Sequence, residues 1–123
     1  MKLTAILHTT FLSADLARSR IFYGDILGLQ EDAKRPVMSF DGIWYVLNAT
    51  QQIHLMLLPN PEVDLVRAAH GGRDRHVAYG VNDIAELRTR LIAANITFTE
   101  SSTGRAALFC RDPDDNALEF IGE

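Results

Sequence analysis

The strongest constraint on the fold of this chain is a phrase that occurs twice. The stretch HTTFLSADL begins at His8, and HVAYGVNDI begins at His76. The interval from histidine to aspartate is the same in both copies, since 15 − 8 and 83 − 76 both equal 7. An apolar pattern with helical spacing follows each aspartate. The repetition indicates that the chain builds one structural unit twice.

Each copy predicts an opening strand, a helix and three further strands. Asp15 and Asp83 are suitable N-caps, and the helices are expected to end at Gly28 and near Asn95. The later strands are expected at about 35–40, 43–48 and 52–58 in the first copy, and at about 96–101, 105–111 and 117–121 in the second. The predicted fold class is α+β. A single domain over 1–123 contains two tandem βαβββ modules, at about 3–58 and 75–122, forming a curved mixed β-sheet half-barrel around a cleft.

Composition narrows the function classes. The net charge is −4 and no basic cluster is present, which argues against nucleic-acid binding. One cysteine, Cys110, excludes an intrachain disulfide framework and fits a reducing compartment. No stretch approaches the roughly 18 apolar residues of a membrane span, and the apolar run at the N-terminus is interrupted by His8. We therefore expect a soluble, cytoplasmic protein that does not associate with membranes.

Strand alternation and the repeat together predict a cluster of polar side chains. Side chains alternate across a strand, so His8 and Thr10 should face the cleft, and His76 should do so at the equivalent place. The last strand of each copy carries a polar residue between two apolar ones, His54 and Glu119, which should face the cleft too. Three imidazoles and a carboxylate suit Fe, Ni, Zn, Co or Mn. Each histidine alone is more often a surface or satisfied residue, but the repeat selects these positions jointly.

Two further motifs carry a family resemblance. FYGDILGL at 22–29 and DPDDNALEF at 112–120 occur within the duplicated pattern. With the four polar positions, they resemble the glyoxalase/bleomycin resistance protein/extradiol dioxygenase superfamily, the vicinal oxygen chelate fold, over essentially the whole chain. The resemblance implies one divalent metal ion per site, bound by His8, His54, His76 and Glu119. It also implies that the metal chelates substrate oxygens and stabilises negative charge as a Lewis acid.

The chain departs from glyoxalase I-like members at several of these positions. His54 stands where such members commonly have Glu or Gln, so the site contains more nitrogen ligands and the expected proton shuttle is altered. Leu12 stands where they carry an arginine for the glutathione carboxylate, and Leu58 where they carry an asparagine. These differences disfavour a glutathione-hemithioacetal isomerase. Asp115 replaces a frequent glycine in the last turn, which aspartate tolerates.

The first functional hypothesis is a small metal-dependent lyase, isomerase or dioxygenase acting on a small oxygenated molecule. His54 and Glu119 are the expected proton-transfer residues, and His70 is expected to be an exposed loop histidine. The resemblance also implies a homodimer, in which the ligands of one site come either from one chain or from both subunits. The alternative is a metal-free binding or drug-sequestering protein of the bleomycin-resistance type; a regulatory dimer with a vestigial site is a third hypothesis. The candidate substrate-binding residues are Thr10, Gln52, Met56 and Arg111.

Overall fold

A computed structural model of the protein describes residues 1–123. The chain divides into two compact units, Met1–Pro61 and Glu62–Glu123, and each is described by itself. No helix in either unit is long and apolar enough to cross a membrane.

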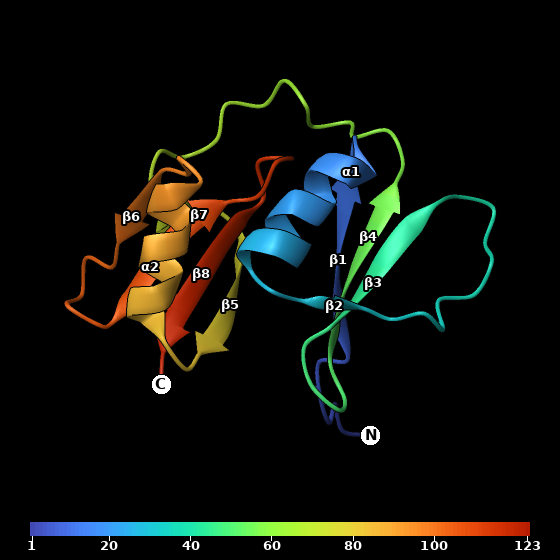
Figure 1. The fold of residues 1–123 in the computed structure, drawn as a ribbon, viewed down its shortest axis with the longest axis horizontal. Helices are drawn as coiled ribbons and strands as arrows, with labels where there is room; N and C mark the ends of the chain where they lie inside the picture. Colours follow the sequence, from blue (N-terminus) through green and yellow to red (C-terminus); the bar gives the residue numbers. More distant parts are fainter. The chain divides into compact units, whose positions relative to one another are not determined.

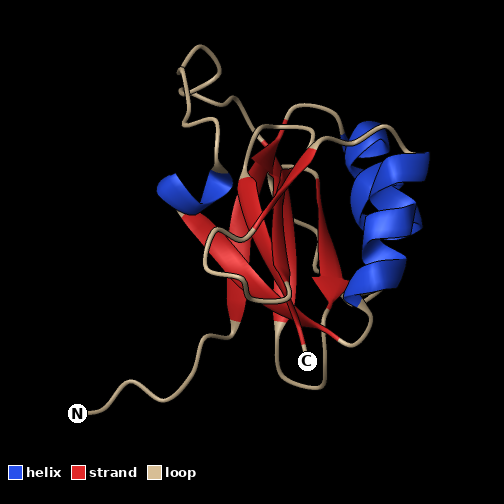
Figure 2. Ribbon diagram, turned by 90° about the vertical axis from the view of Figure 1, so that its left-hand side faces the viewer, coloured by secondary structure: helices blue, strands red, loops and turns tan.

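The first unit contains one four-stranded mixed sheet (Figure 1). Its elements are β1 (His8–Ser13), α1 (Leu16–Ser19), a π-helix (Arg20–Ile26), β2 (Gln30–Glu31), β3 (Gly42–Val46) and β4 (Gln52–Leu57). The strand order is β1-β4-β3-β2, in which β1 runs parallel to β4 and the other pairs are antiparallel. The first seven residues are exposed, and the N-terminal end of this segment extends away from the strands (Figure 2).

The second unit repeats this topology. Its elements are a 3₁₀ turn (Gly71–Arg73), β5 (His76–Val81), α2 (Ile84–Ala93), β6 (Phe98–Glu100), β7 (Ala107–Arg111) and β8 (Ala117–Gly122). The strand order β5-β8-β7-β6 again pairs the first and last strands in parallel. Figure 1 shows α2 lying across one face of this sheet. The predicted α+β fold class, with one module built twice, is confirmed.

The helix boundaries follow the chemistry of their caps. The Asp15 carboxylate accepts from the Arg18 N–H at 3.2 Å, and the Asp83 carboxylate accepts from the Glu86 N–H at 2.8 Å. Gly28 has φ 75° after the first helical segment, and Asn95 has φ 55° after the second, so both residues end a helix in the left-handed conformation. The predicted starts and stops are confirmed. The first helical segment differs in kind, because it changes from one α-helical turn into a π-helix at Arg20.

The strand predicted at about 35–40 is wrong. The structure has no strand there and places the two-residue β2 earlier, at Gln30–Glu31. Pro36 has no backbone N–H to donate to a sheet, and the Arg35 side chain donates instead to the Phe40 carbonyl oxygen at 2.9 Å. This hydrogen bond closes the segment into a loop, which brings Arg35 towards the sheet.

Strand alternation separates the core from the functional face. In the first unit Ile43, Tyr45, Ile53 and Leu55 are at most 2% exposed and form the core. Their neighbours in sequence, including Trp44 and His54, are only half-buried because they lie on the opposite face. In the second unit Leu108 and Leu118 are fully buried. The core therefore fixes the strands whose other face carries the candidate site.

Candidate metal centre and binding cavity

The first unit brings two of the predicted metal ligands together. The β1–β4 register pairs Thr10 with His54 in parallel, which places the side chain of His8 beside that of His54. The two imidazole rings stack with centroids 4.1 Å apart and planes 13° apart. The Trp44 ring also stacks on the His54 imidazole, with centroids 4.2 Å apart and planes 4° apart. Since two rings cannot occupy the same face, His54 lies between His8 and Trp44, and its orientation is fixed by the stack.

A hydrogen-bond chain determines the tautomer of His54. The Gln52 amide nitrogen donates to the Asp32 carboxylate at 2.8 Å, so the Gln52 amide oxygen faces His54 Nε2, also at 2.8 Å. An amide oxygen accepts only, which assigns the hydrogen to Nε2 and leaves the lone pair on Nδ1. Burial lowers the pKa of His54, and the charges of His8 and Arg35 act in the same direction. The neutral imidazole, the form that binds a metal, is therefore favoured.

The second unit brings the other two predicted ligands together. The β5–β8 register pairs Ala78 with Glu119, and His76 Nε2 lies 3.3 Å from the Glu119 carboxylate. His76 Nδ1 lies 2.8 Å from the backbone carbonyl oxygen of Asp74, which accepts only, so Nδ1 carries a hydrogen. In a neutral His76 the Nε2 lone pair then faces a carboxylate that is 9% exposed. A cation between the two groups, either a proton or a metal ion, removes the repulsion, so this pair fits a metal ligand set.

The loop that orients His76 is itself fixed by charged groups. The Asp74 carboxylate accepts from Arg67 and from Arg111, each at 2.8 Å. These hydrogen bonds, that of Arg111 first, lower the pKa of Asp74 to about 2. Arg111 also donates to the carbonyl oxygens of Ala68 and Asp115. The structure therefore engages the Arg111 guanidinium in a network that supports His76, and its contact with substrate stays a prediction.

A cavity of about 560 Å³ lies within the first unit, against the stacked rings. Its lining includes the three predicted substrate-binding residues of this unit, Thr10, Gln52 and Met56, together with His8 and His54. It also includes residues that the sequence analysis missed as site residues: Arg35, Met38, Phe40 and Trp44. The incorrect strand at 35–40 concealed the first three of these. The fourth was missed because its strand parity could not be fixed from the sequence.

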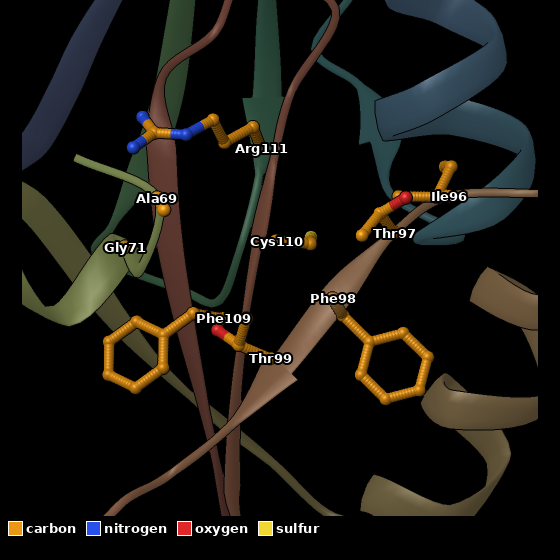
Figure 3. Close-up of a pocket in the computed structure, with 9 residues that line it drawn as sticks. All are labelled: Ala69, Gly71, Ile96, Thr97, Phe98, Thr99, Phe109, Cys110 and Arg111. Carbon is orange, nitrogen blue, oxygen red and sulfur yellow. The ribbon is translucent and has the colours of Figure 1, made fainter. Parts of the chain in front are cut away.

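The second unit has a smaller cavity of about 260 Å³, shown in Figure 3. In that view Phe109 and Arg111 extend to one side of β7, while Phe98 of β6 extends the other way. The Phe109 ring, which lines this cavity, lies edge-on to the His76 imidazole with ring centroids 5.4 Å apart. Cys110 also lines the cavity, but burial raises the pKa of its thiol to about 12 and keeps it protonated. This cavity therefore adjoins the His76–Glu119 pair through Phe109 and has no reactive group of its own.

The structure assembles pairs of the predicted donors. No three His, Cys, Asp or Glu side chains form a group that could hold a metal ion. The first pair offers two imidazoles, and the second offers an imidazole and a carboxylate. The predicted four-ligand site, which requires both pairs, therefore stays a prediction.

The chain is similar to known proteins of one family. The model of the glyoxalase/bleomycin resistance protein/dioxygenase superfamily matches residues 5–120. Glyoxylase I 4 of Arabidopsis thaliana is 23% identical over 98% of this chain and 71% of its own length. A glyoxylase/bleomycin resistance protein/dioxygenase domain from Frankia sp. EAN1pec superposes with a TM-score of 0.75 at 25% identity, covering 98% of each chain. Leishmania major glyoxalase I superposes with a TM-score of 0.74 at 24% identity, covering 98% of this chain and 88% of the glyoxalase chain.

Proposed function

Because this chain belongs to the glyoxalase/bleomycin resistance protein/dioxygenase superfamily, we propose that it is a metal-dependent enzyme acting on a small oxygenated organic molecule. A lyase, isomerase or dioxygenase reaction is included in this proposal. The observation that carries it is the His76–Glu119 pair, at 3.3 Å with the other nitrogen of His76 already bound to a carbonyl oxygen. The same geometry accommodates a proton or a metal ion between His76 and Glu119, so metal analysis distinguishes a simple ion pair from a metal site.

In this proposal the single domain of residues 1–123 uses both pairs, so His8, His54, His76 and Glu119 hold one divalent ion. The bound ion supplies Lewis-acid polarisation of a substrate oxygen. The chain supplies orientation, because the Trp44–His54–His8 stack and the Asp74 carbonyl oxygen each fix an imidazole. Thr10, Gln52 and Met56 form part of the cavity wall and are proposed to contact the substrate.

Two residues are proposed to move protons in the reaction. Glu119 is a partly shielded carboxylate beside His76, and its shielding from water favours proton exchange with a bound substrate. His54 has a lowered pKa and one available lone pair, on Nδ1, which either binds the metal or accepts a proton from the substrate. In the second role His54 acts as the base in place of the glutamate that related enzymes use.

The first test measures metal content in native, tag-free protein by elemental analysis. We expect about one divalent ion per chain, and its loss in His76→Ala, because the hydrogen bonds that orient the ligands cannot replace a missing ligand. His70→Gln is the matched control, since His70 lies outside both pairs and its Nδ1 accepts from the Gly72 N–H at 3.0 Å. No metal in wild-type protein, and no uptake after dialysis against Zn²⁺, Fe²⁺, Ni²⁺ and Mn²⁺, would contradict the proposal and favour the metal-free binding protein.

A second test concerns the proposed homodimer with shared sites. Each chain provides one pair from each unit, so two chains that exchange pairs make two equivalent sites. His8→Ala and Glu119→Ala are each expected to lose metal. If pairs are exchanged between subunits, a refolded mixture of the two variants regains roughly a quarter of the sites, because half of a random mixture is heterodimer with one intact site. If the mixture regains none, the two pairs of a site come from the same chain.

A further inference from the structure

One charged group in the first-unit cavity has no ionic partner. Four arginines are partly buried: Arg35, Arg67, Arg88 and Arg111. Three of them pair with carboxylates, namely Arg67 and Arg111 with Asp74, and Arg88 with Glu100. Arg35 has no carboxylate within ion-pair distance, and its Nε–H is shielded from water without an acceptor. A partly buried positive charge without a counter-charge is costly, and a bound anion would offset that cost.

The loop holds the Arg35 guanidinium in one place. Its Nη2 donates to the Phe40 carbonyl oxygen at 2.9 Å, and its Cζ lies 5.7 Å from the centre of the Phe40 ring. Gly42 leaves room for it, because a Cβ at that position would lie 3.0 Å from Nη2. The guanidinium is therefore pre-positioned, which reduces the entropy lost when an anion binds.

The cavity around Arg35 contains one fixed positive charge, that of Arg35 itself, and is otherwise largely apolar. No aspartate or glutamate lines it. The remaining surface includes Trp44, Met38 and Met56, which offer apolar contacts to a ligand. With a volume of about 560 Å³, the cavity has room for a small organic molecule.

We propose that this cavity binds a small organic anion, whose carboxylate, phosphonate or phosphate group is bound by Arg35 while its apolar part packs against Trp44 and the methionines. The inference rests on the proposed function, for which it names the substrate class. An anionic group bound by a fixed guanidinium directs the rest of the molecule towards His8 and His54. Neutral analogues of the same shape are rejected because they leave the arginine unpaired.

The test uses Trp44 fluorescence, since Trp44 is the one tryptophan in the chain and lines the cavity. Metal-free full-length protein, prepared by dialysis against a chelator, is titrated with phenylacetate, phenylphosphonate and the neutral phenylacetamide. We expect at least one anion to bind about tenfold or more tightly than phenylacetamide, and Arg35→Gln to abolish that preference while Arg35→Lys retains part of it. The stronger of the two anions identifies the preferred group.

The control variant is Arg20→Gln, which removes an exposed arginine of the same unit that pairs with Glu31. It should bind the anions as wild-type protein does. Equal affinity for anion and amide in wild-type protein, or an unchanged preference in Arg35→Gln, would overturn the inference. Because the titrations are made without metal, anion binding in a protein that takes up no metal would contradict the metalloenzyme proposal and leave this inference standing. Metal uptake without a preference for anions would support the metalloenzyme proposal and overturn this inference.

Discussion

Tyr45 provides a sharp test of the face assignment on β3. Its side chain is fully buried on the core face, next in sequence to Trp44 on the cavity face, and its hydroxyl has no hydrogen-bond partner. Burying a hydroxyl without a partner costs about 1–3 kcal/mol. Tyr45→Phe removes that hydroxyl and keeps the ring. We therefore expect the variant to gain about 1 kcal/mol in free energy of unfolding at pH 7, although most core substitutions destabilise a protein.

The same group predicts a pH dependence. Burial raises the pKa of Tyr45 from 10.0 to about 12, so the folded state favours the neutral phenol. For an acid with a raised pKa, its stability contribution is fully present below the unfolded pKa of 10.0 and is lost as pH rises towards 12. At pH 11, which lies midway between these two pKa values, the free energy of unfolding of wild-type protein should have fallen by about 1.4 kcal/mol because of Tyr45. Tyr45→Phe has no phenol to ionise at this position, so it should not show this loss.

The assay is urea unfolding followed by circular dichroism at pH 7 and pH 11. The stability difference between Tyr45→Phe and wild-type protein should widen by about 1.4 kcal/mol between the two pH values. Tyr23→Phe is the control, since Tyr23 is equally buried but its hydroxyl is not among the buried atoms that lack a partner. A loss of stability in Tyr45→Phe at pH 7, or a difference that does not change with pH, would refute the reasoning.

Three further predictions concern the second unit. Leu118→Ala, next to Glu119, should lower the free energy of unfolding by about 3 kcal/mol in urea titrations, because Leu118 is fully buried. Cys110 has a pKa raised to about 12 by burial, so it should react with a thiol reagent at pH 8 only after unfolding; fast labelling of native protein would contradict this. Asp115 has φ 71°, a left-handed conformation that a β-branched residue adopts poorly. Asp115→Val should therefore lower the melting temperature more than Asp115→Gly, because valine in this conformation costs about 1–2 kcal/mol of stability.

The duplicated architecture and the pairing of the proposed ligands within each unit could be predicted from the sequence because they depend on short-range chemistry. Asp15 and Asp83 cap helices wherever a free N–H follows them, and the equal spacing from His8 and His76 marks the two copies. Strand alternation then assigns His54 and Glu119 to the same faces as those histidines, as the parallel registers of β4 and β8 confirm. These inferences need only the period of a strand and the repeat itself.

The tertiary structure alone determined which groups surround those ligands. Arg35 reaches the cavity because a side-chain hydrogen bond to Phe40 closes a loop that the local sequence suggested as a strand. The tautomer of His54 depends on Asp32, which lies 20 residues from Gln52 in sequence. The orientation of His76 depends on Asp74, whose carboxylate is bound by Arg111, 37 residues away. Such contacts arise from loop closure and distant pairing, which no local periodicity encodes, so the sequence alone predicted which of these residues lie together and the fold supplied their surroundings.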